Sequence, residues 1–178
     1  MEKTAQALRQ QGAVQGGGIL IFVTVGTHKQ QFNRLVKAVD DFVAAGKIKD
    51  SVIMQTGNST YAPKNCKHFK FTGKVIIRKI QKNAKVIITH AGAGTIIEAL
   101  SYKKPVIVVP RLKKFGEHTD DHQIDLADNL SRHGIVETVY DVNVLPALIR
   151  RIKPTHARQT KGSLEDYLGG YLESLVGA

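Results

Sequence analysis

The sequence has little cysteine and no long apolar run, and both absences narrow the class of protein. Its 178 residues include one cysteine, Cys66, so no internal disulfide can form, as is usual in the reducing cytosol. Cys66 fits a loop or strand-edge position better than a nucleophile. No run of about 18 apolar residues occurs, so we expect no transmembrane helix. Residues 1–18 also lack the basic start and apolar centre of a signal peptide.

Several signatures of catalysis and binding are missing as well. The chain has neither the G-x-G-x-x-G fingerprint nor the Gly-Lys-Ser/Thr of a P-loop. No Ser/His/Asp arrangement and no pair of carboxylates of the hydrolytic type stands out. An aromatic platform or a basic recognition helix for nucleic acid is also lacking. The sequence therefore favours neither a hydrolase nor a nucleic-acid-binding module.

The composition is that of an ordinary globular protein, with 42% hydrophobic and 23% charged residues, and the length suggests one domain. The net charge of +11 is unevenly distributed. Basic residues outnumber acidic ones by 13 to 3 between residues 28 and 85, whereas residues 86–178 hold 11 of each. The basic half could attract nucleic acid, anionic lipid or phosphorylated substrates, or it could simply be a solvated surface.

Short apolar runs alternate with segments of helical spacing, which predicts an α/β fold with a Rossmann-like, doubly wound parallel sheet. We predict strands at 19–25, 51–55, 66–72, 86–89, 105–109 and 135–139. We predict helices at 32–43, 74–83, 94–101, 120–132 and 142–152. Ligands of such sheets bind beyond the carboxyl ends of the strands. We therefore expect the chemistry in loops 26–28, 57–60, 90–95 and 110–119.

The ends of the chain differ from the middle. Residues 1–18 are polar and rich in Gln and Gly, which is typical of a flexible leader. Residues 19–153 carry the strand and helix pattern and form the expected domain. Residues 154–178 form a polar tail in which leucines and tyrosines recur at helical spacing. This amphipathic helix either packs on the domain or docks on a partner.

The most informative stretch is the glycine-rich turn at residues 90–95 (HAGAGT), between an apolar strand and a helix. Small residues let backbone N–H groups approach an oxyanion, and the helix N-terminus adds a partial positive charge, so a phosphate fits there. Thr95 could cap the helix or donate to phosphate, and the Glu98 carboxylate matches a ribose diol. The alternatives are a tight turn without a ligand and an acid that complements the helix dipole.

Two further loops hold candidate residues. In residues 110–123, His118 and His122 are four apart and could hold a metal, although no further ligand set is apparent. Asp120 and Gln123 have the spacing of a capping box. Arg111 could neutralise phosphate or be solvated. The turn Gly26-Thr27-His28 follows the first strand, where it could contact a ligand, and His28 could act as a base, a hydrogen-bond donor or a simple polar turn residue.

Three blocks together resemble the C-terminal domain of glycosyltransferase family 28. They are residues 23–28 (VTVGTH), 90–99 (HAGAGTIIEA) and 105–123 (PVIVVPRLKKFGEHTDDHQ), in the order of the family. The resemblance is strongest to stand-alone versions of this domain, such as the cytosolic subunit of the two-part N-acetylglucosaminyltransferase of lipid-linked oligosaccharide assembly and its exopolysaccharide relatives. It covers about residues 19–150.

The resemblance implies half of a GT-B fold that holds a UDP-sugar, with the lipid-linked acceptor on a separate membrane-associated partner. It implies substrate contacts for a set of small and polar residues: Gly26, Thr27, His28, His90, Gly92, Ala93, Gly94, Thr95, Arg111, Glu117 and His118. It also implies that Glu98, His122 and Gln123 serve transfer, while the catalytic base lies on the partner. Neither a metal nor another cofactor is expected, because helix dipoles and amides stabilise the leaving UDP.

The sequence thus predicts the donor-binding catalytic subunit of an inverting glycosyltransferase, active with its partner on an acceptor linked to polyprenyl or dolichyl phosphate or pyrophosphate. We expect it in the cytoplasm, held at the membrane through that partner. One alternative is a non-catalytic enhancer subunit of such an enzyme. The other is a nucleic-acid-binding α/β module, which the net charge alone suggests.

Overall fold

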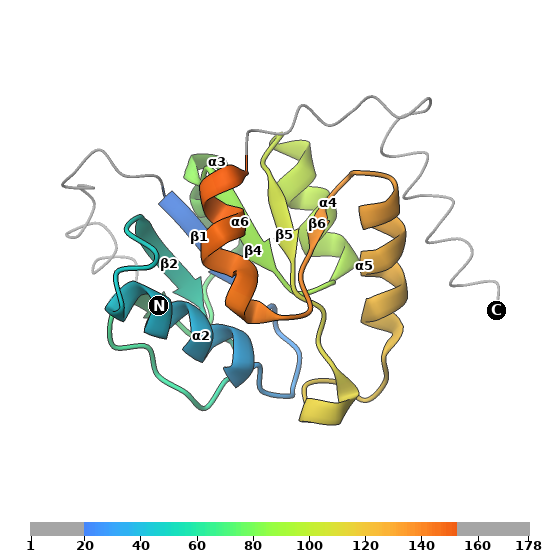
Figure 1. The fold of residues 1–178 in the computed structure, drawn as a ribbon, viewed down its shortest axis with the longest axis horizontal. Coiled ribbons are helices and arrows are strands. Elements are labelled where there is room, and N and C mark those ends of the chain that lie inside the picture. The colour runs from blue at the N-terminus through green and yellow to red at the C-terminus, as the bar shows by residue number, and fades with distance from the viewer. Residues whose placement is uncertain (1–19, 153–178) are drawn as a thin grey trace.

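A computed structural model describes residues 20–152 of the chain, so the predicted leader and tail lie outside the described residues. Its sheet is entirely parallel and has the strand order β3-β2-β1-β4-β5-β6 (Figure 1). The strands are β1 (Leu20–Thr24), β2 (Ser51–Gln55), β3 (Lys67–Phe69), β4 (Val86–Thr89), β5 (Val106–Val108) and β6 (Glu137–Thr138). The chain order reverses at β1, so the crevice beyond β1 and β4 is the topological switch point.

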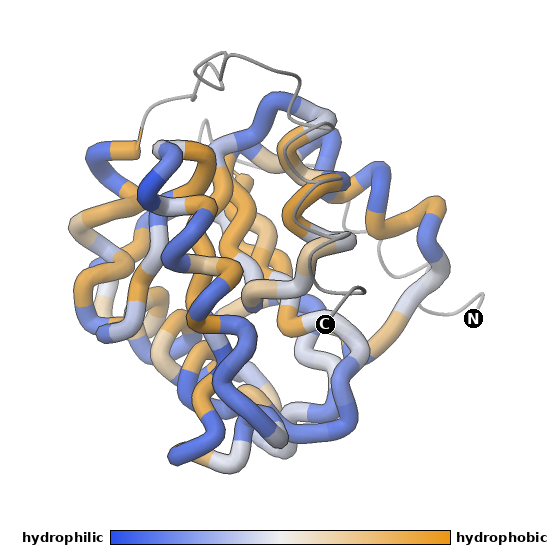
Figure 2. Tube along the Cα trace, turned by 90° about the vertical axis from the view of Figure 1, so that its right-hand side faces the viewer, coloured by the Kyte–Doolittle hydropathy of each residue, from blue (hydrophilic) through white to orange (hydrophobic). Residues whose placement is uncertain are grey.

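The helices cover both faces of the sheet, as the alternating pattern predicts. They are α2 (Asn33–Ala44), α3 (Lys74–Asn83), α4 (Ala93–Ser101), α5 (His122–Arg132) and α6 (Leu145–Arg151), with 3-10 turns η1 (Lys113–Phe115) and η2 (Val142–Val144). Side chains of α2 and α6 pack on one face of the strands. Side chains of α3, α4 and α5 pack on the other. Figure 2 shows the strands as a largely hydrophobic layer between helices that alternate in hydropathy.

The two cores follow from residue spacing. In α2, Leu35, Val36, Val39 and Phe42 recur at the period of a helix and are all buried against the sheet. The central strands β1 and β4 are buried on both sides, which is why they read as continuous apolar runs in the sequence. Gly46, with φ of 66°, follows α2 and lets the chain turn back toward β2.

The predicted boundaries are confirmed for β2, β4 and α3 and differ elsewhere. The strand predicted at 135–139 pairs only over Glu137–Thr138, at the sheet edge. The helix predicted at 142–152 is divided into η2 and α6, because Asp141 caps the first turn and Pro146 sits at the start of the second. The helix predicted from residue 120 begins at His122. Within residues 20–152, no helix has the length and apolar character needed to cross a membrane.

Candidate functional site

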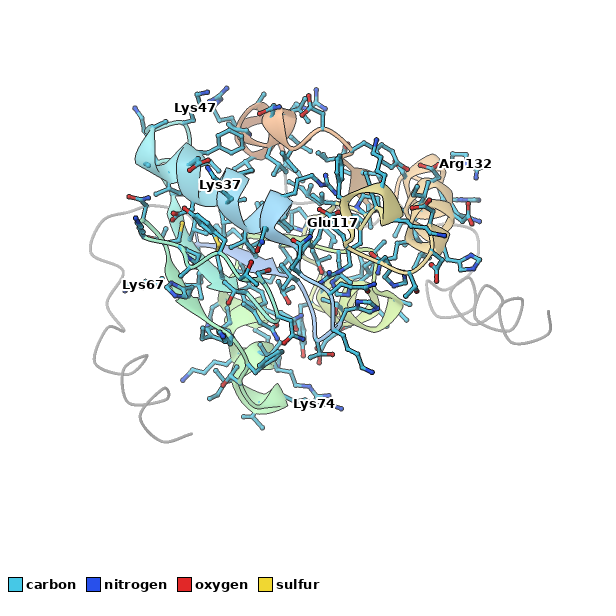
Figure 3. All side chains as sticks on the ribbon, turned by 90° about the horizontal axis from the view of Figure 1, so that it is seen from below. Lys37, Lys47, Lys67, Lys74, Glu117 and Arg132 are labelled. Atoms are coloured by element: carbon cyan, nitrogen blue, oxygen red, sulfur yellow. The ribbon has the colours of Figure 1, made fainter. Side chains whose placement is uncertain are left out.

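The loops that follow β1, β2, β4 and β5 meet at the carboxyl edge of the sheet, and Figure 3 looks onto this edge. They meet at close range. A Cβ added to Gly57 would lie 2.7 Å from the carbonyl oxygen of Gly26 and 3.0 Å from Cγ2 of Val25, so the turns after β1 and β2 pack closely together. Both glycines have positive φ, which L side chains rarely adopt. Glycine is therefore favoured at both turns by the backbone conformation and by the close packing of the turns.

The imidazole of His90 lies between two glycines. A Cβ built on Gly26 would come within 2.4 Å of its Cε1, and one built on Gly92 within 2.3 Å of its Nε2. His90 is buried, and burial lowers its pKa to about 4, with a further contribution from the positive charge of Arg111. The ring is therefore neutral at pH 7. It acts as a spacer between the β1 and β4 turns, and the substrate contact predicted for it stays a prediction.

Helix α4 opens from the turn after β4 with Gly92 as its N-cap, and no side chain caps it. The amides of Thr95 and Ile96 both donate to the carbonyl of Gly92. Among the described residues, the amides of Ala93 and Gly94 donate to no acceptor, and Thr95 is half-buried. A Cβ on Gly94 would meet nothing within 4 Å. The helix start thus presents two free N–H groups beside open space, which is the geometry of an anion site.

Glu98 lies in the second turn of α4, so it does not complement the N-terminal dipole, and that alternative is wrong. Its Oε1 accepts a hydrogen bond of 2.8 Å from Nε of Arg78, on α3. This ion pair raises the pKa of the Arg78 guanidinium. No pattern in the sequence pointed to Arg78, because a cation on an exposed helix is common. A diol that binds Glu98 must share or replace this pair.

Arg111 turns inward, which differs from the phosphate contact predicted for it. Its guanidinium is fully buried and donates to four carbonyl oxygens at 2.7–3.1 Å. The acceptors belong to Val25, Gln30, Gln31 and Glu117. It also lies 4.8 Å from the centre of the Phe32 ring. Arg111 therefore ties the loop after β1 to the loop after β5, and its side chain is not free to neutralise a phosphate.

Glu117 is likewise inside, although we predicted that it contacts substrate. Its carboxylate accepts hydrogen bonds from Nε and Nη2 of Arg34 at 3.0 and 2.9 Å, and from the amide of Leu112 at 3.0 Å. Arg34 also donates to the carbonyls of Pro110 and Tyr140. Figure 3 places Glu117 in the middle of the carboxyl edge. The sequence did not point to Arg34, which reads as one more polar position on α2.

Two histidines form the outer rim of this edge. The rings of His28 and His118 stack with centroids 4.4 Å apart, and Nδ1 of His118 lies 3.0 Å from Asp120. Burial lowers the pKa of His28, and His118 and Arg111 lower it further. Thr27, beside them, is exposed. A ligand bound at the carboxyl edge of the sheet would therefore lie next to these side chains.

His118 and His122 make separate contacts, and the capping box of Asp120 and Gln123 is not formed. His118 precedes α5 and stacks on His28, whereas the side chain of His122 is 81% exposed and 3.9 Å from Asp125. No metal-binding group of three or more His, Cys, Asp or Glu occurs within residues 20–152. Oδ1 of Asp120 accepts from the amide of His122, and Oε1 of Gln123 accepts from the amide of Arg111 at 3.1 Å. Gln123 is therefore fixed against the loop after β5, near the predicted site.

These features define a Rossmann-like α/β domain whose polar loops gather at the switch point of the sheet. Residues 20–165 match the glycosyltransferase family 28 C-terminal domain, and the chain belongs to this family.

Two mammalian relatives are both named UDP-N-acetylglucosamine transferase subunit ALG13. The chain is 35% identical to the Homo sapiens protein over 124 residues, which is 64% of this chain and 10% of that protein. It is 34% identical to the Mus musculus protein over 125 residues, with the same two shares. The chain thus spans about a tenth of the length of these relatives.

Two solved structures share the fold. The UDP-GlcNAc 2-epimerase of Methanocaldococcus jannaschii superimposes with a TM-score of 0.59 at 13% identity, over 99% of this chain and 50% of that one. The calicheamicin glycosyltransferase CalG4 gives 0.58 at 14% identity, over 89% and 44%. In both cases this chain matches about half of the solved chain. The predicted fold, a Rossmann-like sheet that is one half of a GT-B fold, is therefore confirmed.

Proposed function

We propose that the chain is the donor-binding subunit of an inverting glycosyltransferase, and that it holds a UDP-sugar at the start of α4. The observation that carries this proposal is Gly94. Glycine inside a helix costs up to about 1 kcal/mol relative to alanine. No protein atom lies within 4 Å of the place where its Cβ would be, so packing gives no reason for glycine there. A ligand that lies close to the backbone would explain glycine at this position.

The neighbouring groups suit a nucleoside diphosphate. The unpaired amides of Ala93 and Gly94 and the dipole of α4 would stabilise the diphosphate, and this charge grows as UDP leaves. Glu98 would accept from the ribose hydroxyls in place of Arg78. Gln123 and His122, at the start of α5, would approach the sugar. This arrangement supports donor binding without a metal ion.

The remainder of the reaction involves a second chain. The relatives' name supports UDP-N-acetylglucosamine as the donor. We propose that a membrane-bound partner subunit holds a polyprenyl- or dolichyl-phosphate-linked acceptor, and that the assembly works at the cytoplasmic face of the membrane. The acceptor hydroxyl attacks the anomeric carbon, its proton passes to a base on the partner, and UDP leaves with the bonding electron pair. The absence of an evident base among the described residues is consistent with this division.

A calorimetric titration of the full chain with UDP tests the proposal, and Gly94→Ala makes the test specific. The variant should bind UDP at least about tenfold more weakly, because the new methyl group occupies the space of a phosphate. Its stability toward denaturant should rise by up to about 1 kcal/mol, since alanine favours the helix.

Gly73→Ala is the matched control. Gly73 is the N-cap of α3, and a Cβ there also meets nothing within 4 Å. This variant should bind UDP as the wild type does. Absence of any binding by folded wild-type protein, or equal affinity of Gly94→Ala and wild type, would contradict the proposal and would favour the non-catalytic enhancer subunit.

A further inference from the structure

Helix α3 carries charges of one sign on the surface that it turns to solvent. Lys74, Arg78 and Lys82 follow one another at spacings of four, so they form one row, and Lys79 lies beside it. All four are exposed, and no apolar residue of α3 is fully buried. The solvent side of α3 is thus a nearly continuous basic surface.

The row continues onto the neighbouring turn. Nζ of Lys82 lies 5.3 Å from the centre of the Tyr102 ring, next to Lys103, which is exposed. Lys85, directly after α3, is exposed as well. Between residues 61 and 110 the sequence has ten basic residues and one acidic residue, Glu98. That carboxylate pairs with Arg78, so the other cations of this surface have no counter-charge nearby in the sequence.

Two large apolar side chains stand at one end of this surface. Phe71 is 46% exposed and Val75, in the first turn of α3, is 80% exposed. Figure 3 shows Lys74, between them in the sequence, at the rim of the molecule opposite Lys37 of α2. Exposed apolar groups flanked by cations are the pattern of surfaces that insert shallowly into lipid headgroups. We call Phe71, Lys74, Val75, Lys79, Lys82, Lys85 and Lys103 the basic face.

We propose that the chain docks directly onto an anionic membrane through the basic face. Charge complementarity favours a membrane as the binding partner. A negatively charged leaflet attracts the lysines, and burial of Phe71 and Val75 among the headgroups adds to the binding free energy. Nucleic acid fits less well, because the exposed Phe71 and the half-buried Tyr102, which Lys82 contacts, do not form a stacking platform. The inference goes beyond the proposed function, in which the chain reaches the membrane only through its partner.

Co-sedimentation with vesicles tests the inference on the full chain alone. We expect binding to vesicles made of phosphatidylcholine and phosphatidylglycerol in equal parts, and little binding to pure phosphatidylcholine. The triple variant Lys74→Glu, Lys79→Glu, Lys82→Glu should bind the anionic vesicles roughly a hundredfold more weakly. Phe71→Ser with Val75→Ser should weaken binding about tenfold and make the remainder fully sensitive to salt.

The control variant Lys47→Glu, Lys49→Glu, Arg150→Glu changes the net charge equally at exposed positions on α6 and in the loop after α2. It should keep most of the vesicle binding. The inference is overturned if both triple variants lose binding alike, if neutral vesicles bind as well as anionic ones, or if an oligonucleotide displaces the vesicles and depends on the same lysines. Titration of each variant with UDP reports separately on the proposed function, since the basic face contains no residue of the donor site.

Discussion

His90 joins two turns through an uncharged ring, and this makes the stability of the domain dependent on pH. In the folded chain its pKa is about 4, whereas the pKa of a histidine in an unfolded chain is about 6.5. Below pH 6.5 the unfolded chain therefore binds the extra proton, and stability falls until pH 4, where both states are protonated. Between pH 7 and pH 5 we expect a loss of about 2 kcal/mol from this residue.

Urea denaturation at the two pH values measures this loss, and His90→Asn should remove most of it. The lowered pKa of His28 makes stability fall with pH in the same direction, and this effect remains in the variant.

Asp40 affects stability in a different pH range. Burial would raise its pKa, but the amides of Lys64 and Asn65 donate to it and the net shift is downward, so its stabilisation is lost only in more acidic solution. Equal pH dependence in wild type and His90→Asn would contradict the assignment.

Gly92 and Gly94 are close in sequence and should respond in opposite ways to alanine. At Gly92 the added methyl group meets the ring of His90, which cannot retreat because Gly26 lies on its other side. We expect Gly92→Ala to destabilise the domain by about 1–3 kcal/mol. Thermal unfolding of Gly92→Ala beside Gly94→Ala measures the contrast, and a stable Gly92→Ala protein would show that the ring moves freely.

At the scale of elements, a buried ion pair joins α2 to the loop after β5. The side chain of Glu117 is 1% exposed and that of Arg34 is 17% exposed. Arg34→Ala leaves a buried carboxylate without its partner, so we expect a loss of about 3 kcal/mol. Adding Glu117→Gln should recover part of this loss, and a double-mutant cycle from urea denaturation measures the coupling. Additive effects would show that the pair contributes little beyond its separate contacts.

The ion pair between α3 and α4 has a different expected role. The side chains of Arg78 and Glu98 are 58% and 29% exposed, so the pair should add less than about 1 kcal/mol to stability. Glu98→Ala should therefore leave the melting temperature nearly unchanged and reduce the affinity for UDP about tenfold. Arg78→Ala is the matched control, since it breaks the same pair and keeps the carboxylate. If both variants lose affinity equally, the pair itself and not Glu98 is required.

The elements that the sequence predicted well are those whose signal is local. The apolar runs of β2 and β4 and the helical spacing of α3 ended where the structure ends them. The glycine turn before α4 was also visible, because a strand, small residues and a helix follow one another directly. The burial of Arg111 and Glu117 was not visible in the sequence, which predicted that Arg111 neutralises phosphate or is solvated and that Glu117 contacts substrate. Their burial depends on carbonyls and on Arg34 from segments about 80 residues away, which local patterns do not contain.

At the scale of the whole molecule, the proposed division of the reaction between this chain and a partner subunit can be tested directly. The isolated chain should bind UDP-N-acetylglucosamine and transfer none of it to a lipid-linked acceptor, because the base and the acceptor site are proposed on the second chain. Addition of membranes that contain the partner should restore transfer, measured as radiolabelled sugar in the lipid fraction. Transfer by the purified chain alone would contradict the division.

The ring of His90 has one more consequence, which concerns sequence change. The thickness of an imidazole sets how far apart the backbones at Gly26 and Gly92 stand. A smaller residue at position 90 would open room for a methyl group at position 92. In a library randomised at both sites, functional clones should thus pair histidine at 90 with glycine at 92, and a smaller residue at 90 with alanine at 92, so that the two positions behave as one inherited unit.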